Sequence, residues 1–487
     1  MRNEQQFSNL IYEYLLQKFH FQHYQLNDTL PTIDSFCREF SVSAQTVQTA
    51  LKRLRDEGYI TMRNGQYTKV IFSQSEAEAQ AFNLRFFAER SAAFADLSEA
   101  GRLIWIPLLI EGMKQLNADE IHYLSSLAEC THVEDPVYFY CFILQKLENP
   151  LAMNLFWEFT LYQGFPITHR NNTDNFYNLD LIRQGLKGAV HHLKIKAWPN
   201  LLDQLLLLQD NIYARSADYI QKAQEANSSA PQLPFRWRIY RERPQHCYSL
   251  AVRLMHDIYL GEYRASHYLP SYEKMAEKYG YSISTIRRTI KLLNQLGTCR
   301  SENGKGTRIF TIGEKGDSPD FSCKAIRRNL AYFFQAFELI IYSCENVFMM
   351  TLPTLTAQQY NDLINQLKIY ADTDQCELSL WCLLITIAEA CPLHSIREIY
   401  GKLYGLFLWG HPLKANHERG EHNISDQDFT LALIHTLENK NINETALLIK
   451  DFVSRQFIRA ENYLLKQGMQ PEELRLPISF RLLVPAE

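Results

Sequence analysis

A run of cationic and hydroxyl-bearing residues between Ser284 and Lys291 is the stretch best suited to chemistry with a charged partner. In "SISTIRRTIK", Ile286 and Ile290 are four residues apart, which is the spacing of the buried face of a helix. Arginine on the opposite face can bind guanine with two hydrogen bonds or neutralise phosphate. That outer face consists of Ser284, Thr285, Arg287, Arg288 and Lys291.

A glycine-rich turn follows this helix and carries further cations. The segment "CRSENGKGTRIF" predicts two short strands around a turn, at which Gly304 would let a partner approach the backbone. Residues 244–311 contain ten Lys and Arg against five Asp and Glu, so this region is locally basic. The candidate contact residues of the turn are Lys305, Gly306, Thr307 and Arg308.

The same pattern occurs 239 residues earlier in the chain. The stretch "LPTIDSFCREFSVSAQTVQTALKRLRDEG" (30–58) matches "LPSYEKMAEKYGYSISTIRRTIKLLNQLG" (269–297) without a gap. Residues 1–72 contain eight Lys and Arg against seven Asp and Glu, so this copy is nearly neutral. Amide and hydroxyl groups on its outer face can read bases but cannot neutralise phosphate. Its candidate contact residues are Gln45, Thr46, Gln48, Thr49, Lys52 and Lys69.

Weaker matches extend the repeat through the rest of the chain. Tyr140-Cys141 matches Trp381-Cys382, and the segment from residue 211 matches that from residue 455. The period far exceeds that of a solenoid, so one domain-sized unit is present twice. Two polar pairs, Arg215 with Arg459 and Tyr219 with Tyr463, recur in step and indicate either a ligand pocket or a surface contact.

Helix breaks and caps define the order of elements in the second copy. A helical stripe ends before Pro270, and Ser271 is suited to cap a second helix. Ser282 or Ser284 is suited to cap a third helix, which Gly297 ends. Two helices, a tight turn, a third helix and a hairpin predict a winged helix-turn-helix.

Both copies resemble the DNA-binding domain of GntR-type transcriptional regulators. The resemblance is carried by "LPS" (269–271), "SISTIRRTI" (282–290) and "GKGTRIF" (304–310), and by "LPT" (30–32), "SVSAQTVQTAL" (41–51), "LRDEGYI" (54–60) and "GQYTKVIF" (65–72). It implies binding to double-stranded DNA, commonly as a homodimer on a pseudo-palindrome, although a duplicated chain could instead form a pseudo-dimer by itself. At four positions where the family often has arginine, this chain has another residue, so its operator is expected to differ from those of the family. These positions are Asp34, Ala44, Glu273 and Ile283.

Between the halves, "AQEANSSAPQLP" is small, polar and typical of a linker. The next stretch, "FRWRIYRERP", alternates arginine with aromatic residues. Its arginines could lie along a phosphate backbone as an arm of the second winged helix, or form a salt-bridged strap between the two halves. They are Arg236, Arg238, Arg241 and Arg243.

Composition limits the remaining classes. The net charge is −4, 46% of residues are hydrophobic, and the ten cysteines include no CxxC pair, which is typical of a folded protein of a reducing cytoplasm. Neither a signal peptide nor a membrane-spanning segment is expected. Cys391 and His394 have CxxH spacing but lack a second ligand pair, so core packing is the better interpretation than zinc.

We therefore predict a mainly α, duplicated chain that acts as a cytoplasmic DNA-binding transcriptional regulator without a cofactor or metal. We predict that it is not an enzyme, because hydrolase, P-loop and dinucleotide motifs are missing. The helical regions would serve dimerisation or sense a small-molecule effector. The alternative is a scaffold whose winged helices bind protein. The predicted domains are a first winged helix (1–73) and helical domain (76–222), a linker with a basic arm (223–243), and a second winged helix (244–312) and helical domain (321–487).

Overall fold

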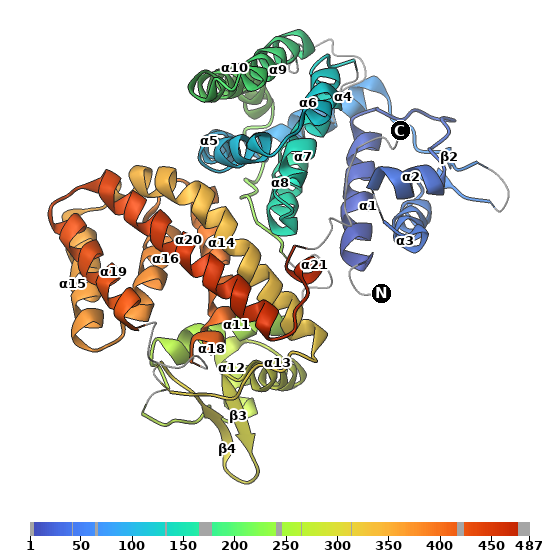
Figure 1. Ribbon diagram of the computed structural model, residues 1–487. Helices are drawn as coiled ribbons and strands as arrows, with labels where there is room; N and C mark the ends of the chain where they lie inside the picture. The colour runs from blue at the N-terminus through green and yellow to red at the C-terminus, as the bar shows by residue number, and fades with distance from the viewer. Residues whose placement is uncertain are drawn as a thin grey trace. The chain divides into compact units, whose positions relative to one another are not determined.

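A computed structural model describes residues 4–40, 42–63, 67–131, 134–164, 178–239, 246–263, 265–312, 314–415 and 423–475 (Figure 1). Two compact units divide the chain between residues 243 and 244. Helices dominate both units, and the strands are confined to two small hairpins. The prediction of a mainly α, duplicated fold is therefore confirmed.

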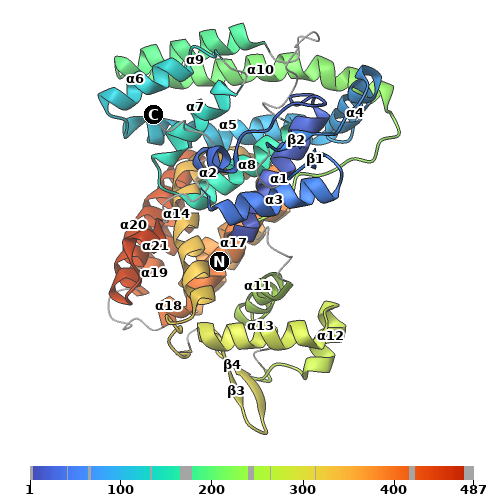
Figure 2. The same ribbon diagram turned by 90° about the vertical axis from the view of Figure 1, so that its right-hand side faces the viewer.

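The first unit begins with a winged helix and continues into a helical region. Its winged helix consists of α1 (Glu4–His20), α2 (Ile33–Phe40), α3 (Ala44–Asp56), β1 (Ile60–Thr61) and β2 (Lys69–Val70). Its helical region consists of α4 (Glu76–Ala88), α5 (Ser91–Lys114), α6 (Ala118–Leu127), α7 (Asp135–Gln145), α8 (Pro150–Gln163), α9 (Leu179–Lys194) and α10 (Trp198–Ala226). Figure 2 shows α9 and α10 running side by side.

The second unit repeats this order. Its winged helix consists of α11 (His246–Tyr259), α12 (Tyr272–Tyr279), α13 (Ile283–Leu296), β3 (Cys299–Glu302) and β4 (Gly306–Ile309), whose hairpin projects from the helices in both views (Figure 2). Its helical region consists of α14 (Lys324–Thr351), α15 (Ala357–Asp372), α16 (Ser379–Ala390), α17 (His394–Phe407), α18 (His411–Ala415), α19 (Asn423–Glu438), α20 (Ile442–Lys466) and α21 (Pro471–Leu474). Three short 3-10 turns lie at Leu352–Thr354, Cys376–Leu378 and Leu408–Gly410.

The helix caps of the two winged helices repeat residue for residue. The hydroxyl of Ser43 accepts a hydrogen bond from the backbone of Thr46, and Ser282 caps α13 in the same way. Of the two serines considered for α13, the cap is therefore Ser282. Gly297 ends α13 with a φ of 86°, in the left-handed region that glycine adopts without strain. Gly58 has a φ of 84° just after α3.

The base of each wing repeats with the same 239-residue spacing. The backbone N–H of Leu30 donates to the carbonyl of Thr68 at 3.0 Å, and that of Leu269 donates to Thr307 at 2.9 Å. A short bridge to the second wing strand accompanies each bond, from Thr29 to Lys69 and from Tyr268 to Arg308. The backbone frame of the domain has therefore been retained in both copies.

The helical regions repeat with a different spacing. Helices α16, α17, α19 and α20 each begin 244 residues after α7, α8, α9 and α10. This spacing places Tyr140 opposite Leu384, so the sequence match of Tyr140 with Trp381 is wrong. The surroundings agree, because Trp381 packs against Tyr259 of α11 at 5.6 Å, whereas Tyr140 packs against Phe156 at 6.4 Å, away from the winged helix.

The first helix of each winged helix packs on the helical region that follows it. In the first unit, Tyr14 meets Trp157 of α8 edge to face at 6.3 Å, and the Gln17 amide donates to the Leu161 carbonyl at 2.8 Å. In the second unit, His256 of α11 shares a 2.8 Å hydrogen bond with Tyr404 of α17. Each winged helix is thus joined to α8 or to its counterpart α17.

A buried ion pair strengthens this junction in the first unit. The Lys18 ammonium lies 3.3 Å from the Glu134 carboxylate, which directly precedes α7. Burial alone would lower the pKa of Lys18, but the Tyr24 and Glu134 groups raise it above its ordinary value. Lys18 therefore remains charged and depends on Glu134 for compensation.

No helix in the described ranges is both long enough and apolar enough to cross a membrane.

Candidate nucleic-acid interface

The exposed face of α13 presents cations that form no ion pair with a described residue. Ile286, Ile290 and Leu293 are buried, so the opposite face of the helix points to solvent. Arg287 and Arg288 are exposed there and form no ion pair with any described residue. The remaining predicted residues of this face are Ser284 and Lys291, which are exposed, and Thr285, which is half-buried.

The second wing extends this basic surface. Lys305 is exposed at the tip of the β3–β4 hairpin, and Gly306 has a φ of +111°. Arg308 is half-buried, with its guanidinium 5.5 Å from the centre of the Phe310 ring. At the base, Arg300 is ion-paired with Asp317, so its charge is compensated. Lys305 and Arg308 are therefore the wing cations available to a partner.

The corresponding face of α3 is polar and mostly uncharged. Gln45, Thr49 and Lys52 are exposed and Gln48 is half-buried. The Thr49 hydroxyl donates to the Gln45 carbonyl at 2.8 Å, so part of its hydrogen-bonding capacity is used within the helix. In the first wing, Lys69 is exposed.

The arginines of α3, which sequence reasoning did not select, are bound within the domain. Arg53 donates to Glu57 at 3.0 Å and lies 3.6 Å from the centre of the Tyr12 ring. Tyr12 in turn donates to Glu57. Burial alone would raise the pKa of Glu57, but the hydrogen bonds from Tyr12 and Arg53 lower it, so the carboxylate stays charged. Arg55 is paired with Asp56 at 2.7 Å.

Two predicted contact residues do not lie on the expected surface. Thr46 is 1% exposed, and its hydroxyl lies 3.0 Å from that of the capping Ser43. Thr307 is 5% exposed because alternate residues of β4 face the core. Lys274, on the first turn of α12, was not selected, although it is exposed and forms no ion pair with any described residue. Its position one turn after the capping Ser271 is a sequence signal that could have identified Lys274 as a contact candidate.

The arginine-aromatic stretch before residue 240 packs against the first unit. Phe235 and Trp237 are 1% and 2% exposed, and the Trp237 indole donates to Asn154 at 2.8 Å. Arg238 donates to Glu13 of α1 and to Glu158 of α8, each at 3.0 Å. Arg238 therefore forms salt bridges within the first unit, which matches neither the expected arm of the second winged helix nor the expected link between the halves. We call residues 227–239, which pack on the first unit, the strap. Arg236 is exposed, and Arg241 and Arg243 lie outside the described residues.

Metal-binding groups do not gather anywhere in the described residues. Cys391 is buried, and its carbonyl accepts a hydrogen bond from Arg397 at 2.8 Å. Cys391 thus belongs to the packing around α17, whereas His394 is exposed at the start of that helix.

Comparison with known proteins agrees with this geometry. The family described as "Bacterial regulatory proteins, gntR family" matches residues 7–70 and, a second time, residues 249–309. Among solved structures, Streptococcus agalactiae GntR is similar, with 19% sequence identity, a TM-score of 0.20, and coverage of 44% of this chain and 99% of that chain. A comparison with curated proteins found no significant match.

The chain therefore carries the GntR-type winged helix-turn-helix twice, as the sequence predicted. Domains of this type occur in DNA-binding transcriptional regulators.

Proposed function

We propose that this protein binds double-stranded DNA with both winged helices, and that the second supplies most of the binding free energy. The observation that carries the proposal is the uncompensated charge of Arg287 and Arg288, set against the Arg53–Glu57 and Arg55–Asp56 pairs of α3. Cations without an internal partner can neutralise phosphates and release counterions.

The first winged helix would contribute sequence preference more than affinity. Gln45 and Gln48 can form paired hydrogen bonds with adenine in the major groove. A glutamine adds no phosphate neutralisation, so its loss leaves the electrostatic part of binding unchanged. The domains follow the repeat: winged helices at 1–73 and 244–312, helical regions at 76–222 and 321–487, and the segment 223–243 between them.

Binding of the full-length protein to a duplex selected by the wild type from a random pool tests the proposal. The double variant Arg287→Ala/Arg288→Ala should bind more than tenfold more weakly. Its log–log salt slope should be less negative by about 1.8, because each lost phosphate contact removes about 0.9. Anisotropy titrations between 50 and 200 mM salt, on the order of the range where such contacts matter, measure both effects.

The matched variant Gln45→Ala/Gln48→Ala should keep the salt slope and change which duplexes are selected. An equal loss of affinity and slope in both double variants would show that the second winged helix does not supply most of the binding free energy. A wild-type protein that selects no duplex would instead favour the scaffold, whose winged helices bind protein.

The helical regions would provide dimerisation or effector sensing. With two winged helices in one chain, either a homodimer or a single-chain pseudo-dimer could present two readers to one site. Light scattering of the protein–DNA complex at saturation counts the chains on one duplex and separates these two states.

A further inference from the structure

An apolar cavity lies inside the first unit, between α5, α7, α8 and α10. Its volume is about 150 Å³, and an apolar cavity of about 150 Å³ accepts a benzene ring. Trp105, Phe156 and Phe159 form much of its wall, and no residue that lines it carries a charge. Gly101 lacks a side chain at the wall, where a Cβ atom would lie 2.9 Å from the Gln209 amide nitrogen.

Three polar side chains line this cavity without a hydrogen-bond partner among the described residues. They are those of Tyr140, Tyr213 and Gln163. Burial raises the pKa of Tyr140, so its hydroxyl keeps its proton and can donate. An apolar wall with a few convergent polar groups is the usual composition of a small-molecule site.

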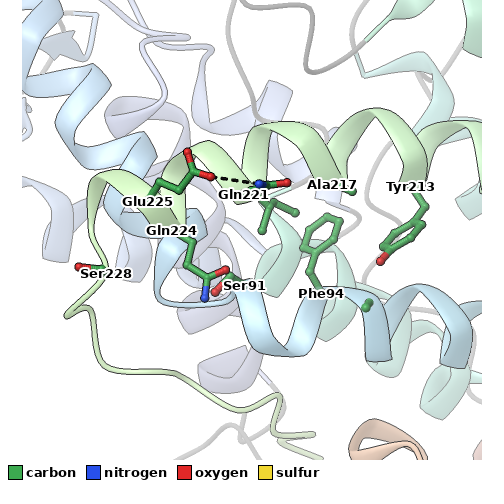
Figure 3. A pocket seen from close by; sticks show the side chains of 10 residues that line it. Ser91, Phe94, Tyr213, Ala217, Gln221, Gln224, Glu225 and Ser228 are labelled. Carbon is green, nitrogen blue, oxygen red and sulfur yellow. Dashed lines mark hydrogen bonds between the residues drawn. The ribbon is translucent and has the colours of Figure 1, made fainter.

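A wider surface groove of about 590 Å³ leads towards the cavity. Helices α5 and α10 form its sides, and Phe94 and Tyr213 line both the groove and the cavity. Figure 3 shows Phe94 and Tyr213 projecting from opposite helices into the space between them. These two rings therefore stand where a ligand would pass from solvent into the cavity.

The second unit has apolar residues at the matching positions. The 244-residue spacing places Leu384, Phe407 and Phe457 opposite Tyr140, Gln163 and Tyr213. Phe407 packs against Phe337 at 4.6 Å, and Phe457 stacks on Phe334 at 4.6 Å. In the second unit, aromatic packing thus replaces Gln163 and Tyr213, and the buried Leu384 replaces Tyr140.

We propose that the first unit binds a neutral aromatic molecule of one or two rings in this cavity, and that the ligand regulates DNA binding through α8. An anion or a cation would be buried there without a compensating charge, which is strongly unfavourable. A phenol- or indole-like compound fits the volume, the aromatic wall and the three free polar groups.

Helix α8 connects the cavity to α1, the first helix of the first winged helix, and to the strap, which precedes the second winged helix in sequence. Phe159 lines the cavity, and its ring also lies 4.7 Å from Phe235 of the strap. Another side of α8 holds α1, through the contacts of Trp157 and Leu161 described above. Arg238 then joins Glu158 of α8 to Glu13 of α1. A ligand that shifts α8 must therefore shift both contacts.

Binding is tested on the full-length protein without DNA, with phenol and benzoate as probes. Phenol should bind the wild type at least tenfold more tightly than benzoate does. Gln163→Phe, which copies Phe407, should weaken phenol binding at least tenfold. Leu207→Phe adds a ring on the outside of α10, where Leu207 is 54% exposed, and should bind phenol like the wild type. Calorimetric titration measures these constants.

Three results would overturn the ligand site: no phenol binding to the wild type, equal binding of benzoate, or undiminished binding to Gln163→Phe. If Gln163→Phe does not fold, Gln163→Glu serves instead, because it keeps the size and adds a charge that should also weaken phenol binding tenfold.

The regulatory part of the inference rests on the proposed DNA-binding function. Saturating phenol should change the affinity for the selected duplex at least threefold. Arg238→Gln should still bind phenol but lose that change. An unchanged DNA affinity of the wild type would overturn the regulation, whereas failure of the proposed function itself would appear as no DNA binding with phenol binding intact.

Discussion

The two units share a backbone frame and differ in what that frame carries. The capping serines, the terminal glycines and the hydrogen bonds at the base of the wing recur at one spacing. By contrast, the cations on the outer face of α13 form no ion pair with a described residue, whereas both arginines of α3 are ion-paired and only Lys52 of that helix is not. Positions fixed by backbone geometry are therefore the same in both units. Surface charge and core polarity differ, because the first unit has the polar-lined cavity and the second has the unpaired arginines of α13.

The largest expected effect concerns the core of the helical regions. Phe407→Ala should lower the free energy of unfolding by about 4 kcal/mol, because it removes a ring packed among Phe333 and Phe337. The matching Gln163→Ala borders the cavity and should change it by no more than about 0.5 kcal/mol. Urea unfolding of the full-length protein measures both, and similar losses would show that the two cores are equally packed.

The second prediction concerns the ion pair found at the junction of the first unit. Glu134→Gln leaves the buried Lys18 ammonium without its partner. The free energy of unfolding should fall by about 3 kcal/mol, at the low end for a buried pair, because some solvent reaches Glu134. Glu129→Gln breaks an exposed pair with Lys187 and should cost less than about 1 kcal/mol. Equal effects of the two substitutions would mean that Lys18 is adequately hydrated.

The third prediction compares the glycines that follow α3 and α13. A Cβ atom on Gly297 would lie 1.9 Å from the Asp317 carbonyl oxygen, whereas one on Gly58 would have no atom within 4 Å. Gly58→Ala should cost about 1–2 kcal/mol for its left-handed backbone. Gly297→Ala should cost at least about 2 kcal/mol more, because overpacking displaces backbone. Thermal unfolding ranks the two variants, and equal midpoints would contradict the prediction.

The smallest expected effect tests whether the Arg53–Glu57 ion pair keeps the first winged helix from binding phosphate. Glu57→Gln removes the carboxylate that holds Arg53. The freed guanidinium could reach one phosphate, which would make the salt slope more negative by about 0.9 and raise DNA affinity severalfold. Asp317→Asn frees Arg300 at the second wing and is the matched control. An unchanged slope for Glu57→Gln would mean that the Tyr12 ring alone keeps Arg53 from DNA.

Local patterns made much of the fold predictable. Ser271 caps α12 with its own side chain, and Gly280 and Gly297 end their helices in left-handed backbone conformations. The Ile286–Ile290 stripe reflects helical periodicity, so none of these features needed tertiary information. Tyr12 and Glu57 are 45 residues apart, and Arg238 and Glu13 are 225 apart, so neither contact has a local signal. Thr46 shows a further limit, because helical periodicity placed it outside, whereas it is 1% exposed in the folded domain.

The cavity escaped the sequence analysis, whereas helix α4 lies within the predicted helical region 76–222. In the second unit, the described residues between β4 and α14 form no helix. A cavity depends on how four helices leave space between them, which no single stretch encodes. The polar residues at Tyr140 and Gln163 were visible in the sequence, but only the helix boundaries showed that their counterparts are Leu384 and Phe407.

The strap also bears on how the chain is made. The described residues of the first unit all lie between Glu4 and Ile239, and the buried Phe235 and Trp237 are among the last of them. During synthesis, a domain that is complete in sequence can fold before the next one leaves the ribosome. Two similar halves in one chain risk exchanging helices while both are unfolded. By placing these aromatic anchors before the second half begins, the chain lets the first half close on its own residues first.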